Sequence, residues 1–489
     1  MSWTKEQSDV IVSRNCNLLV SAAAGSGKTA VLVERIIQMI TDVKNRVDID
    51  KLLVVTFTNA AASEMKERIG DAILKKLETY NKEDNKIKEY KFLNHQLLLL
   101  NKSHITTIHS FCLDVIRANF NSIDIDPNFR IGNQTECNLI KNEALEEVFD
   151  ELYDEENEGF LNLIESYAEK NGDSRVQKLI LDVHNFIKSL PEPKKWLEDS
   201  VEVFNVNDNF DFSTSNLAKI LLEMINVKLE YLLPKMKKVS ESLDGVVVFV
   251  GEVDAMQFYR ERFKSEYINI ASLYEASKKS WNDMQNLLSN FEFEKFNAKG
   301  RKKIPKENEC EKETYEEAKK ARDEIKKEIE KLQKSDFIRS NEDLKYEFDI
   351  LYKITKTISE VVIKFDDKYN SMKREKSIID FNDIEHFAFK ILTEKDENGN
   401  LTPSNVARNY QDYFEEVMTD EYQDSNLIQE VIMQMVSKQD RKNRFMVGDV
   451  KQSIYRFRQA RPELFLQKYY EYSLSSDSKL RKILLYKNF

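Results

Sequence analysis

Two short stretches of this 489-residue chain contain residue types that could do phosphate chemistry. The first, AAAGSGKT, runs from Ala22 to Thr29 and fits the P-loop pattern GxxxxGK[ST], except that alanine stands at the first glycine position. The second, EEVMTDEYQDSN, runs from Glu415 to Asn426 and contains five carboxylates. Backbone N–H groups of a P-loop and of the helix after it bind phosphate oxygens. The first stretch therefore predicts a phosphate site, to which the second could add a metal ligand.

The flanks of AAAGSGKT match this mechanism, because an apolar strand precedes the loop and a helix follows it. Lys28 would reach the β- and γ-phosphates of ATP, and the Thr29 hydroxyl would bind Mg²⁺. The alternative, a chance glycine turn before a helix, is disfavoured by the Lys-Thr pair in the required place. The predicted cofactor-binding residues of the loop are Ala22, Ala23, Ala24, Gly25, Ser26, Gly27, Lys28 and Thr29.

An acidic run taken alone is usually solvated surface. A P-loop changes this expectation, because it needs an acidic strand end to hold the magnesium. Asp420 is the predicted Mg²⁺ ligand, and Glu421 would orient or deprotonate the attacking water. The strand before them is imperfect, since Glu415, Glu416 and Thr419 are polar where Val or Ile would be expected.

Three successive strand–helix units, over residues 17–40, 51–74 and 104–116, predict a parallel sheet with helices on its faces. Residues 126–375 are charged and helical in period, and the β-prone GVVVFVG is an isolated exception. The alternation of predicted strands and helices resumes near residue 377. The predicted architecture is one α/β domain, residues 1–125 and 376–489, interrupted by a mostly helical insertion, residues 126–375.

Within the insertion, residues 313–335 predict a charged helix with one narrow apolar stripe, which suits an antiparallel helical hairpin. The stripe consists of Ala318, Ala321, Ile325, Ile329 and Leu332. Just before it, the basic KGRKKIPKENE is either a solvated linker or a contact to nucleic-acid phosphates, and the sequence leaves both open.

The net charge of −11 is unevenly distributed: residues 1–120 carry +3, residues 441–489 carry +8, and the remainder carries −22. Local basic surface decides nucleic-acid affinity, so a global acidic balance does not exclude it. No stretch approaches about 18 uninterrupted apolar residues, and no membrane span is expected. The four cysteines form no CxxC pair, which indicates reduced thiols of a cytoplasmic protein.

Aromatic residues alternate with arginines in YRFRQAR, where Tyr455, Arg456, Phe457 and Arg458 follow one another. This pattern suits a platform on which single-stranded bases stack. An ordinary alternative is a buried strand face with the arginines in salt bridges, and it stays open for one of the two aromatics.

Six segments occur in this order: WTKEQSDVI, AAAGSGKT, TFTNAAASEMKERI, ITTIHSF, DEYQDSN and GDVKQSIYRFRQA. The set resembles the motifs of superfamily 1 helicases of the UvrD/Rep/PcrA/RecB group, over most of residues 1–120 and 376–489. The segments VTFTNAAASEMKERI and GDVKQSIYRFRQARPELF, together with the long acidic insertion, most resemble helicase–nuclease subunits of the AddA (RexA) type. The resemblance implies a RecA-like P-loop NTPase domain that uses ATP and Mg²⁺. It also implies a DNA substrate with a single strand and a duplex end, an AddB-like partner protein, and a role in recombinational repair of double-strand ends.

The resemblance also assigns roles to single residues. Gln7 would read adenine, Phe489 would stack on adenine, and Gln452 would sense the γ-phosphate and couple it to DNA, which makes Lys28, Glu421 and Gln452 the predicted catalytic set. The predicted DNA contacts are Thr56, Phe57, Asn59, Thr107, His109, Ser110, Tyr455, Arg456, Phe457 and Arg458. His109 could equally be a satisfied core histidine. The carboxylates of DFND, Asp380 to Asp383, are expected to be structural.

The final KILLYKNF resembles the start of a further helicase motif, so we expect a first motor domain whose second motor and nuclease domains lie outside this sequence. Such a chain would bind ATP·Mg²⁺ and turn it over slowly. One alternative is a stand-alone UvrD/PcrA-like helicase, against which the insertion of about 250 residues argues. Another is a non-motor P-loop ATPase switch or DNA-binding scaffold, against which GDVKQSIYRFR argues.

Overall fold

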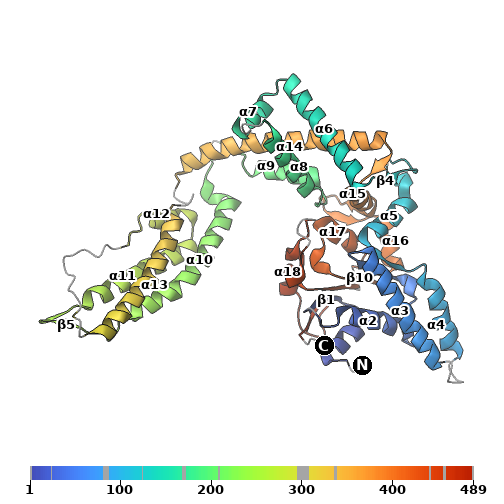
Figure 1. Ribbon diagram of the computed structural model, residues 1–489, viewed down its shortest axis with the longest axis horizontal. Coiled ribbons are helices and arrows are strands. Elements are labelled where there is room, and N and C mark those ends of the chain that lie inside the picture. The colour runs from blue at the N-terminus through green and yellow to red at the C-terminus, as the bar shows by residue number, and fades with distance from the viewer. Residues whose placement is uncertain are drawn as a thin grey trace. The chain divides into compact units, whose positions relative to one another are not determined.

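The structure is a computed structural model. It describes residues 3–23, 25–80, 87–123, 125–167, 172–207, 210–293, 305, 308–334, 339–439, 442–454 and 459–486. The chain forms two compact units, of which unit 1 comprises Met1–Ser200 and Lys356–Phe489 and unit 2 comprises Val201–Thr355 (Figure 1). These limits describe packing and differ from the predicted domain limits at residues 126 and 375, which stay a prediction.

Unit 1 is built on a six-stranded sheet in the order β12-β1-β11-β10-β2-β3, with every neighbouring pair parallel. The strands are β1 (Asn17–Ala22), β2 (Leu52–Thr56), β3 (His104–Thr107), β10 (Glu416–Thr419), β11 (Arg444–Gly448) and β12 (Leu480–Leu485). β10 lies between β11 and β2, although the insertion separates it from β2 in sequence. The prediction of an α/β domain with a parallel sheet and a helical insertion is therefore confirmed.

Helices cover both faces of this sheet, because successive strand residues point to opposite sides. In β2, Val54 packs into a core with α2 (Lys28–Thr41) and α3 (Asn59–Tyr80). Val55 packs into a second core with α5 (Ile108–Asn119), α15 (Phe381–Leu392) and α17 (Leu427–Met435). The helices of unit 1, including α9 and α14 that cross its limits, are α1 (Lys5–Val12), α2 (Lys28–Thr41), α3 (Asn59–Tyr80), α4 (Ile87–Leu100), α5 (Ile108–Asn119), α6 (Gln134–Asp154), α7 (Glu158–Tyr167), α8 (Ser174–Ile187), α9 (Pro193–Glu202), α14 (Asn341–Glu375), α15 (Phe381–Leu392), α16 (Asn405–Tyr413), α17 (Leu427–Met435) and α18 (Pro462–Glu471).

The acidic residue inside β10 is compensated by a buried arginine. Glu416 is 5% exposed, and its Oε1 accepts a hydrogen bond of 2.7 Å from Nε of Arg35 on α2. The Arg35 guanidinium also donates to the Val10 carbonyl oxygen and lies over the Phe445 ring, 4.9 Å from its centroid. A polar residue is thus tolerated in a fully buried strand because a partner from another element neutralises its charge.

Two short strands join the ends of the predicted insertion. β4 (Arg130–Ile131) pairs in parallel with β7 (Ile378–Ile379), so the places where the chain leaves and re-enters the α/β part lie side by side. A further hairpin in unit 1 joins β8 (Thr393–Lys395) to β9 (Leu401–Pro403).

Unit 2 is a helical bundle made of α10 (Asn216–Glu241), α11 (Gln257–Ser277), α12 (Trp281–Ser289) and α13 (Glu309–Gln333). The predicted stripe on α13 packs into the common core, with Ala318, Ile325 and Ile329 buried and Ala321 and Leu332 partly buried. The segment GVVVFVG contributes β5 (Phe249–Val250), which forms a small hairpin with β6 (Val253–Asp254).

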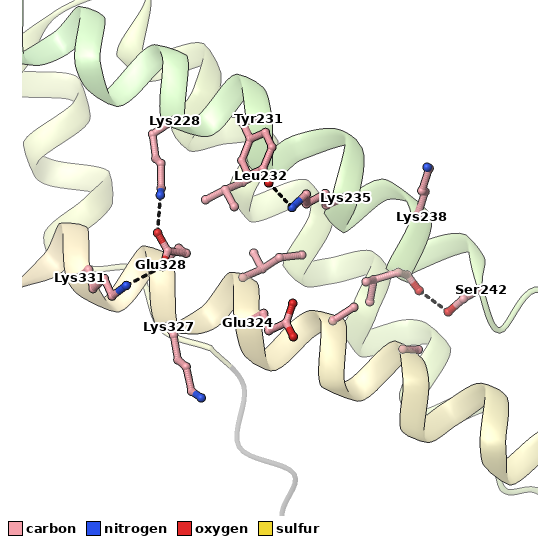
Figure 2. Close-up of a pocket in the computed structure, with 14 residues that line it drawn as sticks. Lys228, Tyr231, Leu232, Lys235, Lys238, Ser242, Glu324, Lys327, Glu328 and Lys331 are labelled. Carbon is pink, nitrogen blue, oxygen red and sulfur yellow. Dashed lines mark hydrogen bonds and ion pairs between the residues drawn. The ribbon is translucent and has the colours of Figure 1, made fainter. Parts of the chain in front are cut away.

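The open side of α10 and α13 forms a groove of about 710 Å³ with several lysines on its walls (Figure 2). Glu328 of α13 is ion-paired there with both Lys228 of α10 and Lys331. Most of the basic stretch KGRKKIPKENE lies outside the described residues, so its two interpretations stay open.

None of the helices among the described residues combines the length and the apolar character that a membrane crossing needs.

Candidate nucleotide-binding site and adjoining loops

The P-loop residues lie between the end of β1 and the start of α2, as the sequence predicts. Gly25 and Gly27 have φ angles of +74° and +79°, which residues with a side chain adopt only with strain. Gly27 is the N-cap of α2, and Lys28 and Thr29 form its first turn. The N–H groups of a first turn have no partner within the helix, so this end of α2 can bind an anion. Ala24 lies outside the described residues.

The three predicted catalytic residues meet at one point. Lys28 Nζ lies 3.1 Å from Oε2 of Glu421 and 3.4 Å from Oε1 of Gln452. Glu421 follows β10, and Gln452 ends a short 3-10 turn after β11, Val450–Gln452. Because β1, β10 and β11 are parallel neighbours, their carboxyl ends share one edge of the sheet. The cluster is thus a product of strand order.

Glu421 adopts a left-handed backbone conformation with φ of +49°. A non-glycine residue in this region is uncommon and is held there by its surroundings. Here the Glu421 carboxylate contacts Lys28 Nζ and accepts a 2.8 Å hydrogen bond from Nε2 of Gln423. Its side chain is still 36% exposed, so a water molecule can reach it.

Asp420 stands between β10 and Glu421, and its backbone N–H donates to the Val55 carbonyl oxygen at 2.9 Å. Burial, followed by the negative charge of Glu421, raises the pKa of Asp420 to about 6. A cation beside this carboxylate would favour its charged form. The position and electrostatics of Asp420 therefore fit a metal ligand.

Other polar groups of the P-loop and of residues 419–424 fit a magnesium ion that also binds phosphate. Among the described residues, no three His, Cys, Asp or Glu side chains gather into a metal site. Mg²⁺ is commonly held by one or two carboxylates together with phosphate oxygens and water. The hydroxyl oxygens of Ser26 and Thr419 are buried without a hydrogen-bond partner, as is Oδ1 of Asp424. This donor set fits a nucleotide-bound Mg²⁺, with Thr29 and Asp420 as the predicted protein ligands.

A hydrogen-bonded link between the segment after β10 (residues 420–426) and the segment after β11 (residues 449–452) was not predicted from the sequence. Oε1 of Gln423 accepts a 2.9 Å hydrogen bond from the Asp449 N–H, while its Nε2 donates to Glu421. Asp449 in turn accepts a 2.7 Å hydrogen bond from Nε2 of Gln452. The side chain of Gln423 occupies the space in which a Cβ of Gly448 would stand. The glycine of GDVKQ was the available signal, because a glycine at a strand end can mark close approach.

Gln7 lies on α1 beside the P-loop. Thr4 and Gln7 form a capping box at the start of α1, and Nε2 of Gln7 donates to the Ser26 carbonyl oxygen at 3.2 Å. A small pocket next to it is lined by Gln7, Leu485 and Tyr486, among others, and Tyr486 is 76% exposed. This placement is compatible with the predicted adenine contact. Phe489, the predicted stacking residue, lies outside the described residues. Tyr486, which lines this pocket, was not among the residues predicted from the sequence.

The predicted DNA contacts that the structure describes follow β2 and β3, at the same edge of the sheet. Thr56 ends β2 and is buried, Phe57 is partly buried, and the exposed Asn59 opens α3. Thr107 ends β3 and caps α5 by accepting from the Ser110 N–H at 3.3 Å. The order β11-β10-β2-β3 thus places this group beside the Lys28 cluster. Tyr455, Arg456, Phe457 and Arg458 lie outside the described residues.

His109 in the first turn of α5 has a definite partner. Its Nε2 lies 3.1 Å from Oε1 of Glu385 on α15, and its ring meets the edge of the Phe381 ring with centroids 5.3 Å apart. The His109 side chain is 31% exposed, so it is neither a fully buried core histidine nor free in solvent. Its predicted DNA contact stays a prediction.

The carboxylates of DFND have structural partners. Asp380 and Asp383 form a capping box at the start of α15. Nζ of the buried Lys373 lies 3.2 Å from Asp380 and 2.6 Å from Asp383, and the Tyr369 hydroxyl donates to Asp380 at 2.9 Å. The structure therefore agrees with the expectation that these residues are structural.

Comparison with known proteins gives one consistent result. Residues 3–473 match the model of the UvrD/REP helicase N-terminal domain. The whole chain is 54% identical over 488 residues to an ATP-dependent helicase/nuclease subunit of Clostridioides difficile (strain 630), and 48% identical over 490 residues to that of Thermoanaerobacter sp. (strain X514). The chain spans 37% and 38% of the length of these two relatives. As the motifs predicted, the chain belongs to the UvrD/REP helicase family.

Proposed function

We propose that this chain is the ATP-driven motor region of a helicase–nuclease that processes DNA double-strand ends for recombinational repair. Its relatives are named as ATP-dependent helicase/nuclease subunits, and the chain matches just over a third of their length. Unwinding of DNA, cleavage of DNA and an AddB-like partner protein belong to the proposal for the complete protein. So does the predicted cytoplasmic localisation.

One observation carries the proposal most directly: Lys28, Glu421 and Gln452 converge within hydrogen-bond distance, although more than 390 residues separate Lys28 from the other two. A P-loop lysine stabilises the charge on the β- and γ-phosphates as the phosphoryl group is transferred. A carboxylate beside it can orient or deprotonate the attacking water. The triad supports ATP hydrolysis, with the glutamine in a position to sense the γ-phosphate.

Each residue has a separate task in this proposal. Backbone N–H groups from Gly25 to Thr29 bind the phosphates, and Lys28 leaves Glu421 to contact the γ-phosphate. Release from Lys28 frees the Glu421 carboxylate for the water. Thr29 and Asp420 would hold Mg²⁺, which when bound neutralises charge that develops on the phosphates.

Gln452 connects hydrolysis to DNA in the proposal, because it contacts the Lys28 cluster and precedes the YRFR segment by three residues. Thr56, Asn59 and Thr107 lie at or just after the ends of the neighbouring β-strands, where single-stranded DNA could run along the edge of the sheet. The adjacency of the two groups supports a motor in preference to a DNA scaffold that merely binds ATP.

The test is Glu421→Gln in the full-length protein that contains this chain. Since general-base catalysis contributes about 10²–10⁴-fold, the rate of ATP hydrolysis should fall at least 100-fold with ATP binding retained. Glu415→Gln is a matched control from the same segment, because that side chain is 45% exposed and pairs with Lys438 at the other end of β10. Hydrolysis by Glu421→Gln near the wild-type rate would refute the assignment. A wild-type ATPase that single-stranded DNA does not stimulate would favour the non-motor alternative.

A further inference from the structure

A buried carboxylate on α15 accepts hydrogen bonds from the N-terminal ends of two other helices, α5 and α17. Glu385 is 3% exposed. Its Oε1 lies 3.1 Å from His109 Nε2 and accepts from Gln429 Nε2 at 2.6 Å, while its Oε2 accepts from Asn426 Nδ2 at 3.3 Å. All three donors are side chains, and none belongs to α15.

The donors come from functionally distinct places. His109 lies in the first turn of α5, directly after β3, among the predicted DNA contacts. Asn426 follows DEYQDS directly and is the N-cap of α17, where it forms a capping box with Gln429. α15 packs against both α5 and α17 (Figure 1). Glu385 therefore stands between the predicted DNA side and the acidic loop that begins at Asp420.

The acidic loop, residues 420–426, is short and internally hydrogen-bonded, so a backbone shift at Asn426 is passed on to Glu421. The Asp424 N–H donates to the Glu421 carbonyl oxygen at 2.9 Å, and the Ser425 N–H donates to the Tyr422 carbonyl oxygen at 3.2 Å. Asn426 is the next residue. A rotation of this cap would change the backbone that holds Glu421 in its left-handed conformation.

We propose that Glu385 is a positioning residue that couples the DNA-contacting segment at His109 to the ATP-hydrolysing loop through Asn426. The inference rests on the proposed function, since it needs His109 to respond to DNA. DNA that displaces the His109 ring removes one donor from the Glu385 carboxylate. The carboxylate then reorients toward Asn426 and Gln429, and the cap of α17 transmits the change to Glu421.

The charge of Glu385 suits this role. Burial favours the neutral acid, but the donors His109, Gln429 and Asn426 outweigh it and hold the pKa of Glu385 below its usual range. A buried carboxylate that loses a donor must find another, because an unsatisfied charged group costs more than a neutral one. The connection from His109 through Glu385 to Asn426 therefore resists distortion more than a connection made by neutral side chains would.

The experiment measures ATP hydrolysis by the full-length protein without DNA and over a titration of single-stranded oligothymidylate. Glu385→Gln keeps the shape but places an amide N–H₂ against one of the donors. We expect basal hydrolysis close to wild type and a maximal DNA-stimulated rate reduced about tenfold, the effect of losing one hydrogen bond to a charged group. The oligothymidylate concentration for half-maximal stimulation should change less than the maximal rate.

Two further variants separate coupling from loss of folding. Asn426→Ser keeps a good N-cap residue but removes the donor to Glu385, so it should lower the stimulated rate and leave thermal unfolding near wild type. Glu266→Gln in unit 2 is the control, because Glu266 is 1% exposed and paired with Arg322 far from the site in sequence. It should leave DNA stimulation unchanged.

A double-mutant cycle tests the link to His109. His109→Gln added to Glu385→Gln should cause little further loss of stimulation if the two residues act as a unit. Additive losses would overturn the proposal, as would wild-type stimulation of Glu385→Gln or an equal fall of its basal and stimulated rates. If wild-type protein shows no DNA stimulation at all, the proposed function itself is refuted, and that result is distinct from a failure of the coupling.

Discussion

Substitution of Gly448 by alanine tests whether the hydrogen bonds of Gln423 to Asp449 and Glu421 position the carboxylate of Glu421, the proposed catalytic residue. An alanine Cβ at this position would overlap with Oε1 of Gln423 and lie 3.2 Å from the Tyr422 nitrogen. To reach van der Waals contact, the Gln423 amide has to retreat by about 1 Å. That amide accepts from the Asp449 N–H at 2.9 Å and donates to Glu421 at 2.8 Å.

The expected effect on catalysis follows from this displacement. A misplacement of about 1 Å in a catalytic group can cost about 100-fold in rate. We therefore expect Gly448→Ala to lower the rate of ATP hydrolysis about 10- to 100-fold in the full-length protein, with a smaller change in ATP affinity. The loss of the two hydrogen bonds of Gln423 should also lower the free energy of unfolding by about 1–3 kcal/mol.

The assay is steady-state ATP hydrolysis, with nucleotide binding followed by a fluorescent ATP analogue. Gly70→Ala is the matched control, because it makes the same chemical change inside α3, where the added Cβ meets only Leu100 at 3.4 Å. That variant should keep wild-type activity and gain about 0.5–1 kcal/mol of stability. The reasoning is refuted if Gly448→Ala hydrolyses ATP like wild type. It also fails if Gln423→Ala, which removes the same two hydrogen bonds without a steric overlap, leaves the rate of ATP hydrolysis unchanged.

Three more changes have defined outcomes. Glu416→Ala leaves the Arg35 charge buried and should lower the free energy of unfolding by about 3–5 kcal/mol in denaturant unfolding. The double variant Glu416→Leu with Arg35→Met should recover most of this stability. A loss below about 1 kcal/mol for Glu416→Ala would contradict the prediction. Asp420 has its pKa raised to about 6, above an unfolded value of about 3.9, so stability of the nucleotide-free protein should fall as pH rises from about 4 to about 6. Asp420→Asn should abolish that fall and be more stable by about 1–2 kcal/mol at about pH 7; unchanged pH dependence would refute the shift. Thr107→Ala removes the cap of α5 and should cost about 1 kcal/mol in thermal unfolding, and an equal loss in Thr107→Ser would argue against the cap.

The local parts of the site were predictable because each depends on a few consecutive residues. The loop around Gly25 and Gly27 needs positive φ angles, which glycine supplies, and Lys28 and Thr29 open the following helix. The strand–helix units after β1, β2 and β3 likewise follow from apolar runs and helical periodicity. Asp420 was predicted as the Mg²⁺ ligand because a P-loop needs an acidic residue at the end of a second strand.

Other features needed the folded chain. Glu416 weakened the strand prediction until Arg35, 381 residues earlier, proved to be its partner. β12 was not predicted as a strand, because its role as the edge neighbour of β1 depends on the rest of the sheet. The predicted boundaries of the insertion and the limits of the two compact units also differ, since helices from residues 126–200 pack within unit 1.

The sequence by itself determined the chemistry available to this protein: a phosphate-binding loop, an acidic pair, and a set of motifs in the order found in UvrD/REP helicases. Only the tertiary structure decided which of these groups touch. The contacts of Lys28 with Glu421, of Gln423 with Asp449, and of His109 with Glu385 all join separate elements. Backbone conformation and helix capping are settled by neighbours in the chain, whereas side-chain partners across a sheet are set by strand order and register, to which distant segments contribute equally.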